Sequence, residues 1–518
     1  MNLCPITSIK FLRLEFDMAS GGMRQCIQDI TPYLIFLIFI STLGPLQFGF
    51  HLSELNAPQD VITCKKQNEA NSIAVVRTNL PQCIPMNEAE FAALSSLFVL
   101  GGLLGALGSG AMSTSYGRLF AMRITSVCFI VGSVLEIFAG TVPVMSVGRF
   151  FSGIGAGAST VVVPIYISEI APPKERGLFG SMTQITTNVG ILLTQVLGYY
   201  LSKGSKWRII LAVGAGLGLL QGVGLLFIPE SPTWLAAHKD PQMAMRTLQR
   251  IRGHGSSIAE EIQDWNIEPS GEEEERLLLD PELNRRNSVA SKASSQKSTS
   301  NVGFFQVIRD PLYQPAVIAV IGIMFAQQLC GINSIIMYSV SLLSGLLPVS
   351  SSIVTILISV VNLVATVVCA PLADKIGRKA CLLLSISGMG TMSLVLALSL
   401  RWETKVLSAI SVILFVTFFA TGLGPVPFIM ASEFVGPEAV GATQSVGLAA
   451  NYVATFLVAQ FFPIINTRLN RALGGVGWAY FIFAVLAVLS GIFVSWRVPE
   501  TRGKKDADEV WGRTRRVD

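Results

Sequence analysis

The side chains of this chain that could bind a ligand are amides embedded in long apolar segments. Glutamine and asparagine each offer a hydrogen-bond donor and an acceptor without carrying a charge. This combination suits a neutral ligand with several hydroxyl groups, whereas an anion would call for a buried arginine or lysine. The alternative is that each amide only hydrogen-bonds a neighbouring helix. The candidate amides are Gln184, Gln195, Gln327, Gln328, Asn333, Asn362 and Asn451.

A histidine and a glutamate three residues apart form the second chemical feature. His51 can titrate near neutral pH, and Glu54 falls on the same face of a helix. One hypothesis is that the two residues form a proton site. The alternative is that neutral His51 makes one interhelical hydrogen bond while Glu54 lies in water near the helix end.

The elements that must position these side chains are membrane-spanning helices. The chain is 51% hydrophobic and only 14% charged, against about 25% charged residues in soluble domains. Apolar stretches of about 18 residues or more cross the bilayer as helices, because lipid cannot satisfy loose backbone polar groups. We therefore predict an all-α, polytopic membrane protein. Its twelve spans are expected to begin near Pro32, Ala89, Leu119, Val142, Leu178, Trp207, Leu312, Ser350, Arg378, Val406, Val440 and Val476.

The two halves of the chain repeat one another. Each half runs through a short G-R turn, an apolar segment ending in Ser-Glu, and a Pro-Glu exit from its last apolar segment. A polar stretch separates the halves; its first part has helical spacing of apolar residues and its remainder is typical of disorder. We expect a cytoplasmic N-terminal segment (1–31), an N-terminal bundle (32–230), a cytoplasmic linker (231–303), a C-terminal bundle (304–498) and a cytoplasmic tail (499–518).

Charges and cysteines in the loops bear on orientation. Lys and Arg collect on alternate connections, so the positive-inside rule predicts that both termini are cytoplasmic. Cys64 and Cys83 share the long loop between the first two spans on the opposite side, where either a disulfide or two free thiols is consistent with the sequence. Ser288 follows two arginines and is a candidate phosphorylation site. The alternative is a chance occurrence, because such patterns are common in linkers.

Six motifs in fixed order resemble the signatures of the sugar porters of the major facilitator superfamily, over residues 32–503. Residues 47–58 and 262–265 look closest to a fungal branch that includes a yeast sugar-porter-like protein linked to vacuolar protein sorting. The six motifs are G-R-F at 148–150, V-P-I-Y-I-S-E-I-A-P at 163–172, P-E-S-P at 229–232, Q-Q-L-C-G-I-N at 327–333, D-K-I-G-R-K at 374–379 and P-E-T-R-G at 499–503.

The resemblance implies two six-helix bundles that rock around a central site. It places six of the candidate amides, all except Gln195, where sugar porters hydrogen-bond the sugar, and Phe428 where many have a tryptophan that stacks on the sugar ring. It places His51 where proton-coupled members have an aspartate and facilitative members a neutral amide. It also assigns gating roles, against the alternative of structural ion pairs, to Arg118, Arg149, Glu169, Arg176, Asp374, Arg378 and Glu433.

Three positions depart from the family pattern. Thr114 and Val440 replace charged residues near the gating motifs, and Ala420 stands where many members have a glutamate. These replacements weaken the expected gating contacts. They are consistent with looser gating or with a protein that senses more than it transports.

The function we expect is secondary transport of a monosaccharide or polyol, either facilitated or coupled to protons. The alternatives are a transport-inactive sugar sensor or trafficking factor of the vacuolar pathway, and a carrier of another small metabolite. We expect no enzyme activity, cofactor, metal or nucleic-acid partner. The expected setting is a lipid bilayer, vacuolar or plasma membrane, with the protein as a monomer.

Overall fold

The computed structural model describes residues 31–65, 80–172, 175–238, 241–253, 258–262, 304–343, 351–369, 372–436, 439–504 and 507–512. Within these ranges every regular element is a helix. Ser288, the candidate phosphorylation site, lies outside the described residues.

Six long helices form the N-terminal bundle, and their starts lie within two residues of the predicted span starts. The short α3 (Gln59–Ile62) and η2 (Gly204–Lys206) connect them. The long helices are α2 (Pro32–Ser53), α4 (Glu88–Tyr116), α5 (Arg118–Ile137), α6 (Val142–Ile170), α7 (Arg176–Leu201) and α8 (Trp207–Gly224).

The C-terminal bundle has the same number of spans, two of which are broken into a pair of helices. The broken spans are α15 (Gln314–Leu329) with α16 (Ile332–Leu343), and α20 (Lys405–Thr421) with α21 (Val426–Glu433). The continuous spans are α17 (Ser351–Cys369), α19 (Arg378–Arg401), α22 (Val440–Leu473) and α23 (Trp478–Arg497).

The helices are long and apolar enough to cross a membrane, with one informative exception. Ten spans pass a test of length and hydropathy, and the bent pair α15/α16 makes an eleventh. The remaining span, α7, is 26 residues long but carries Thr, Gln and Asn along its length. A polar span is stable in a bilayer only when its polar side chains face the bundle interior. The all-α polytopic fold with twelve spans is therefore confirmed.

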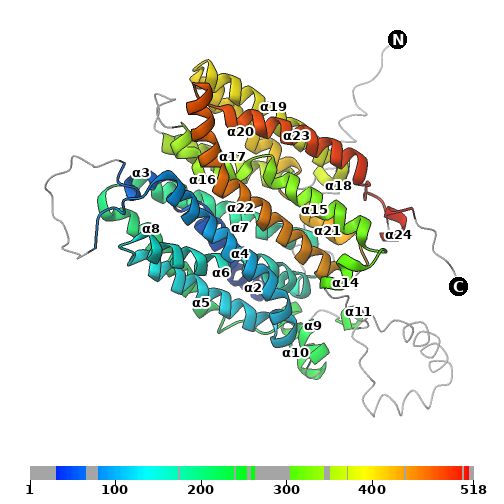
Figure 1. Cartoon of the computed structure of the whole chain (residues 1–518). Helices are drawn as coiled ribbons and strands as arrows, with labels where there is room; N and C mark the ends of the chain where they lie inside the picture. Colours follow the sequence, from blue (N-terminus) through cyan, green and yellow to red (C-terminus); the bar gives the residue numbers. More distant parts are fainter. Residues whose placement is uncertain are drawn as a thin grey trace, which may run out of the picture.

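The two bundles lie side by side, and α4 of one runs along α22 of the other (Figure 1). The helices α7 and α17 form the second long contact between the bundles. One end of the molecule, here called the linker end, carries the short helices α9 (Pro232–His238), α10 (Pro241–Arg252), α11 (Ala259–Ile262), α14 (Phe304–Arg309), α18 (Leu372–Ile376) and α24 (Ala507–Val510).

The sequence repeat is reproduced as a repeated contact at the linker end. Glu230 accepts hydrogen bonds from the backbone N–H groups of Arg118 and Leu119, and Glu500 accepts them from Arg378 and Lys379. In each half a carboxylate thus satisfies the free N–H groups at the start of a helix, α5 or α19.

A glycine precedes each of these capped helices. Gly117 and Gly377 have φ of 104° and 112°, in the region that side chains avoid, and a Cβ would lie 2.3 and 2.6 Å from the carboxylate of Glu230 or Glu500. The G-R turn is therefore required both by the backbone conformation and by the approach of the carboxylate.

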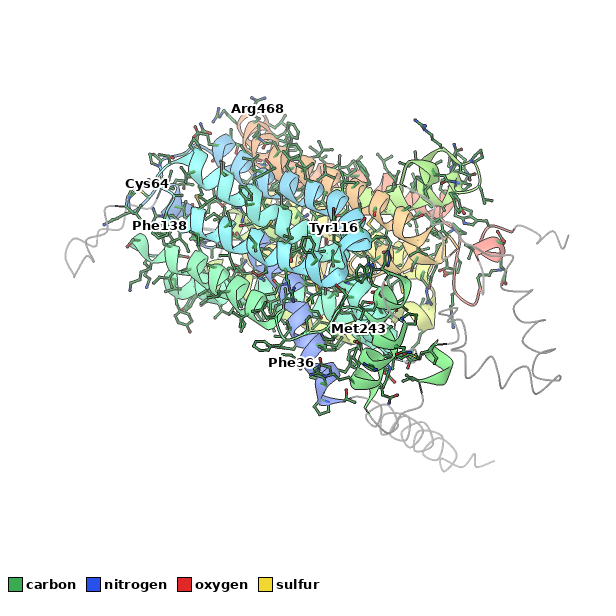
Figure 2. All side chains as sticks on the ribbon, turned by 90° about the horizontal axis from the view of Figure 1, so that it is seen from below. Phe36, Cys64, Tyr116, Phe138, Met243 and Arg468 are labelled. Atoms are coloured by element: carbon green, nitrogen blue, oxygen red, sulfur yellow. A yellow bond between two sulfur atoms is a disulfide. The ribbon has the colours of Figure 1, made fainter. Side chains whose placement is uncertain are left out.

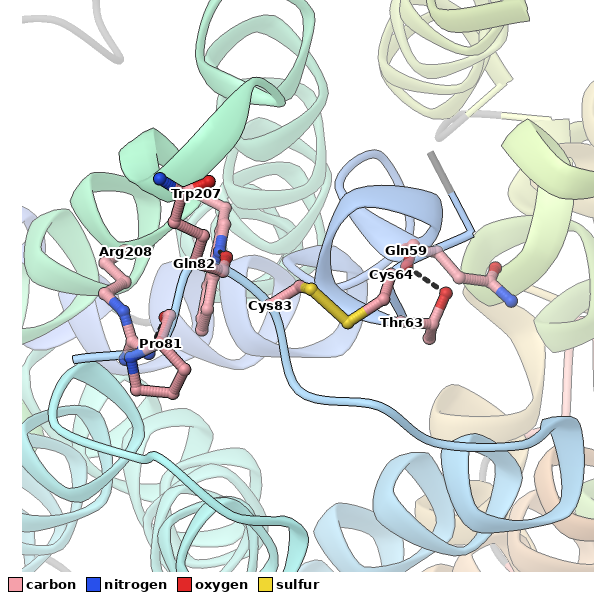
Figure 3. Close-up of a disulfide and its surroundings, with 8 residues drawn as sticks. All are labelled: Gln59, Thr63, Cys64, Pro81, Gln82, Cys83, Trp207 and Arg208. Atoms are coloured by element: carbon pink, nitrogen blue, oxygen red, sulfur yellow. Dashed lines mark hydrogen bonds between the residues drawn. A yellow bond between two sulfur atoms is a disulfide. The ribbon is translucent and has the colours of Figure 1, made fainter. Parts of the chain in front are cut away.

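At the opposite end, here called the disulfide end, Cys64 and Cys83 are joined in a disulfide (Figures 2 and 3). The neighbouring loop residues are tied to α8: Trp207 Nε1 donates to the carbonyl of Gln82 at 2.8 Å and Arg208 donates to that of Pro81 at 3.0 Å. Of the two alternatives left open by the sequence, the structure has the disulfide.

Reduction or removal of this disulfide is expected to destabilise the protein. The bond closes a loop with a sequence separation of 19 residues, for which the loss of chain entropy corresponds to about 3 kcal/mol. A Cys64→Ser, Cys83→Ser double variant should melt at a lower temperature in detergent than the wild type. Cys128→Ser, which removes an unpaired thiol, is the control, and an unchanged melting temperature of the double variant would contradict the expectation.

Candidate functional site

Four of the predicted amides come together in one buried cluster, here called the amide cluster. Gln328 donates to Asn451 at 3.2 Å, Asn333 donates to Gln328 at 2.6 Å, and Asn451 donates to Gln327. The four side chains are between 4% and 9% exposed. They come from α15, α16 and α22, so the cluster lies within the C-terminal bundle.

The amide cluster lies where two broken spans meet. The chain turns at Gly331, whose φ is 98°, and the following helix bends by 41° from α15. Gln327 Nε2 donates across the break between α20 and α21 to the carbonyls of Leu423 at 2.5 Å and Gly424 at 3.2 Å. Broken helices supply free backbone groups at membrane depth, and such sites are characteristic of carriers.

The amides Gln184 and Asn362 belong to a second polar group that joins the two bundles. Asn188 of α7 donates to Thr366 at 2.9 Å and accepts from Asn362 at 3.3 Å, while Gln184 lies 3.5 Å from Asn188. These contacts connect α7 with α17. The predicted amides therefore form two groups rather than one.

A cavity adjoins this second group. It encloses about 290 Å³, including space that opens to solvent. Gln195 and Asn362 both line it, and their side-chain oxygens are buried without a hydrogen-bond partner. The remaining lining residues are Ile191, Ile335, Ile336, Thr355, Ile358, Ser359 and Val416.

Phe428 is the predicted site residue that the structure leaves outside both groups. It lies on α21 and is 38% exposed. No other aromatic ring among the described residues stacks on it. Its ring is therefore accessible rather than part of the packed core.

His51 and Glu54 lie in a buried charged cluster with two further residues, Glu136 and Arg149. His51 Nδ1 lies 3.0 Å from Glu54, and Arg149 donates to Glu54 at 2.5 Å and to the carbonyl of His51 at 2.7 Å. Glu136 accepts a hydrogen bond from Ser152 at 2.9 Å. All four side chains are at most 1% exposed.

The structure corrects one sequence-based interpretation at this cluster and locates another predicted residue. Glu54 is buried and ion-paired, so the alternative in which it lies in water is wrong. Arg149 pairs with Glu54 inside the bundle, whereas the resemblance had grouped it with the gating charges. The G-R-F motif identified Arg149 as a charged residue but gave no information about how deeply its side chain is buried in the bundle.

The cluster also bears on the expectation that the chain has no metal-ligating set. Possible ligand atoms of His51, Glu54 and Glu136 all lie within 4.8 Å of one another. Both oxygens of Glu54 already interact with His51 or Arg149. A guanidinium in direct contact with a proposed ligand opposes a divalent cation, because two positive charges would share a site of low dielectric constant.

Apart from Arg149, the predicted gating charges whose side chains the structure describes form ion pairs within each bundle at the linker end. Arg118 pairs with Glu169 at 2.8 Å in the N-terminal half, and Arg378 pairs with Glu433 at 3.0 Å in the C-terminal half. Thr501 donates to Glu433 at 2.5 Å. Arg176 lies in α7 and Asp374 in α18, but their side chains are outside the described part of the structure.

Hydrogen bonds between the two bundles include a set towards the disulfide end. Asn56 donates to the carbonyl of Ile336 at 2.9 Å, Ser96 to Gln460 at 2.7 Å, and Thr467 to Glu88 at 2.8 Å. By contrast, the two ion pairs at the linker end each join residues of the same bundle. The conformation is therefore one in which the disulfide end is held closed between the bundles.

Two polar residues of these sites were not among the predicted candidates: Glu136 and Asn188. Glu136 is the one acidic residue of α5, and an acid inside a span is a functional candidate by default. Asn188 follows Gln184 by one helical turn. A search of each span for acids as well as amides, and for neighbours one turn away, would have identified both.

Two broken spans around buried amides, in a bundle of twelve helices with an internal repeat, define a secondary carrier. The sequence matches the family model of the sugar (and other) transporters over residues 37–509. The chain therefore belongs to the sugar porters of the major facilitator superfamily, and it is a transporter rather than an enzyme.

Its relatives include two yeast proteins and mammalian glucose transporters. The chain is 34% identical to the probable metabolite transport protein YBR241C of Saccharomyces cerevisiae, over 95% of this chain and 98% of the relative. It is 32% identical to the vacuolar protein sorting-associated protein 73 of the same yeast, over 92% and 96%. It is 29% identical to facilitated glucose transporter member 3 of Ovis aries, over 92% and 91%.

Among solved structures, the xylose transporter XylE of E. coli in a partially occluded inward-open conformation has the same fold. The TM-score is 0.71 at 22% sequence identity, covering 92% of this chain and all of XylE. This similarity independently supports the major facilitator fold.

Loss of the carboxylate that caps α5 is expected to destabilise the N-terminal bundle. Glu230→Ala leaves the N–H groups of Arg118 and Leu119 without their acceptor, which should cost about 1–3 kcal/mol. The melting temperature of the purified variant should fall, and Glu500→Ala should lower it similarly through α19. Asp508→Ala, which removes an exposed carboxylate, is the control; a matching fall in this control would assign the effect to general charge loss.

Proposed function

We propose that this protein carries a neutral monosaccharide or polyol across a membrane by alternating access. The observation that carries the proposal is the amide cluster of Gln327, Gln328, Asn333 and Asn451 at the meeting point of two broken spans. Every one of its side chains is uncharged and offers both donor and acceptor. Each hydroxyl group of a polyhydroxylated ligand can take the place of one amide in these hydrogen bonds, as donor or as acceptor.

The arrangement disfavours an ionic substrate. The amide cluster contains no charged side chain. The buried Arg149 of the other bundle is already paired with Glu54. An anion bound among amides alone would lack a compensating charge in a site of low dielectric constant. The similarity to a mammalian glucose transporter and to a bacterial xylose transporter also supports a neutral sugar.

The cavity next to Asn362 extends the proposed site towards α7. The buried oxygens of Gln195 and Asn362 lack partners, and an unpaired buried acceptor is costly unless a ligand or water supplies a donor. Hydroxyl groups of a bound sugar would meet that need. Phe428, accessible on α21, would offer an apolar ring to the less polar face of the sugar.

For orientation, we propose that the linker end is cytoplasmic. The basic loops and both termini then lie on one side, as the positive-inside rule requires, and the disulfide of Cys64 and Cys83 lies in a lumen or outside the cell. We propose that the protein acts as a monomer in the vacuolar or plasma membrane. The relative named for vacuolar protein sorting favours the vacuole.

A second candidate function is a transport-inactive sensor or trafficking factor. It rests on the 32% identity with the yeast protein named for vacuolar sorting and on the replacement of family charges by Thr114, Val440 and Ala420. The relative named as a probable metabolite transport protein favours a carrier instead, of a sugar or of another small metabolite.

Replacing an amide of the cluster is expected to abolish most sugar transport. Asn451→Ala removes the partner of Gln327 and Gln328, and the resulting loss of about 1–3 kcal/mol corresponds to a roughly 10-fold or larger fall in uptake efficiency. The measurement is uptake of labelled hexoses and polyols into proteoliposomes that contain the purified protein.

The matched control is Asn466→Ala, which removes the same side chain from a more distant turn of α22 near the disulfide end. Uptake by this variant should stay close to that of the wild type. Saturable uptake that survives Asn451→Ala would place the site elsewhere, and no uptake of any hexose or polyol by correctly folded wild-type protein would favour the second candidate.

A further inference from the structure

Three polar side chains of α17 line the cavity next to Asn362. Thr355, Ser359 and Asn362 follow one another at spacings of four and three residues, which places them on one face of the helix. They are between 2% and 6% exposed. These residues, here called the α17 row, provide three of the four polar side chains among the described lining residues; the fourth is Gln195 of α7.

The orientation of the Asn362 amide is set by a chain of hydrogen bonds that begins at Thr366. The single hydroxyl hydrogen of Thr366 is donated to the backbone carbonyl of Asn362 at 2.8 Å. This hydroxyl can therefore only accept from Asn188, whose Nδ2 lies 2.9 Å away. Asn188 then turns its oxygen towards Asn362, which donates to it from Nδ2 at 3.3 Å.

Asn362 consequently presents its oxygen rather than its nitrogen to the cavity. The atom Oδ1 is buried without a hydrogen-bond partner, while Nδ2 is used by Asn188. Turning the Asn362 amide over would set its oxygen against the oxygen of Asn188. Asn188 could relieve this contact only by turning over as well, and it would then lose its bond to Thr366.

The two hydroxyl groups of the α17 row also face the cavity as acceptors. Thr355 donates its hydrogen to the carbonyl of Ser352 at 2.8 Å, and Ser359 donates to the carbonyl of Thr355 at 2.9 Å. Both hydrogens are thus used by the backbone of α17, and only lone pairs are left for a ligand. Donating to a ligand instead would cost the internal hydrogen bond.

Gln195 is the adaptable polar residue of the cavity. Its Oε1 is buried without a partner, and no hydrogen bond within the described part of the structure fixes its amide. The Gln195 side chain can therefore turn either its oxygen or its nitrogen towards a ligand. The fixed polarity of the cavity comes from α17 alone.

A group that enters the cavity must bring hydrogen-bond donors. An ammonium group is opposed, because none of the described lining residues carries a charge to balance it. An ether oxygen, a fluorine atom or a carboxylate would leave the acceptors of the α17 row unpaired, which is costly in a buried site. A neutral hydroxyl group meets the requirement.

We propose that the α17 row selects the substrate by taking its hydroxyl groups as hydrogen-bond donors. The carrier then rejects analogues that keep the shape of the substrate but lack a hydroxyl hydrogen at these positions. The inference rests on the proposed function, because it assigns the α17 row to the same substrate as the amide cluster. The amide cluster offers donors as well as acceptors and cannot make this distinction.

The first test uses the wild type alone. The probes are labelled D-glucose, D-mannose, D-galactose and myo-inositol, and uptake into proteoliposomes is inhibited by the monodeoxy and monofluoro analogues of each. Fluorine removes the donor and keeps a weak acceptor. At the positions that enter the cavity, both analogues should inhibit about 10-fold more weakly than the parent compound. Fluoro analogues that inhibit as well as the parent at every position would overturn the proposal.

Ser359→Ala assigns one of these positions to the α17 row. Loss of the acceptor should weaken binding of the parent compound by about 10-fold. It should not weaken binding of the analogue deoxygenated at the position facing Ser359, because that analogue has no hydroxyl group to lose. Equal weakening of the parent and of every analogue would contradict the assignment.

The matched control is Ser411→Ala. Ser411 of α20 is also buried and donates to the carbonyl four residues earlier, that of Leu407, but it does not line the cavity. The inhibition constants of this variant should equal those of the wild type. The same loss in Ser411→Ala as in Ser359→Ala would show a general packing effect and overturn the assignment to the α17 row.

Thr366→Val tests the orientation of Asn362 without removing a lining side chain, since Thr366 acts as a positioning residue. Without its hydroxyl group, Asn188 and Asn362 can both turn over, and Asn362 can offer its nitrogen to a fluorine atom. The ratio between the inhibition constants of the fluoro analogue and the parent should therefore fall from about 10 towards parity. Thr366→Ser keeps the hydroxyl group and should keep the wild-type ratio. An unchanged ratio in Thr366→Val contradicts the hydrogen-bond chain, because a merely structural role would weaken both compounds together.

The outcomes separate this inference from the proposed function. Saturable uptake without discrimination against fluoro analogues would leave a sugar carrier whose cavity holds only water, and would overturn the inference alone. No saturable uptake of any probe by correctly folded wild-type protein would reject the proposed function and the inference with it.

Discussion

The structure depends on one constraint: polar groups inside a bilayer must find their partners within the protein. Lipid offers no hydrogen bonds, so each buried amide, carboxylate or free backbone group is either paired or costly. The continuous spans meet this constraint through their own backbone ladders. At Gly331 and between α20 and α21 the helix is interrupted, and backbone groups there need other partners. Gln327 donates to the carbonyls of Leu423 and Gly424, which the second interruption leaves free.

The same constraint explains how the two bundles differ. The C-terminal bundle uses neutral amides around its broken helices, whereas the N-terminal bundle buries charges that nearly balance. An amide network can exchange its internal hydrogen bonds for those of a ligand at little cost. A charge network cannot be rearranged so cheaply, because a broken pair leaves an uncompensated ion.

Much of the fold could be predicted from the sequence, because long apolar segments and an internal repeat are strong signals. The starts of the spans, including the polar α7, follow from them. The amide cluster was predicted in part, since Gln327, Gln328 and Asn333 are close in sequence. Asn451 was a candidate as an amide in an apolar segment, but only the resemblance placed it at the same site as the other three. The division of Gln184 and Asn362 from that cluster could not be predicted, because it depends on Asn188 reaching across from α7 to α17.

The charged cluster shows why motif and physical reasoning must be combined. A motif pointed to Arg149 but not to its partner Glu54, while the helical spacing of His51 and Glu54 correctly suggested their proximity. Glu136 arrives from α5, more than eighty residues after Glu54, and no local pattern relates the two. Pairing between distant helices is set by packing and becomes visible only in three dimensions.

The position of the charged cluster offers a physical connection to the amide cluster. Glu54 lies two residues before Asn56, which donates to the carbonyl of Ile336 on α16. Three residues earlier on α16 stands Asn333, a member of the amide cluster, directly after the bend at Gly331. If α16 moves about this bend when the disulfide end opens, the contact of Asn56 must break. The short stretch that follows α2, which carries Glu54 and Asn56, would then connect the charged cluster with the position of Asn333, so that the two clusters bias one two-state element.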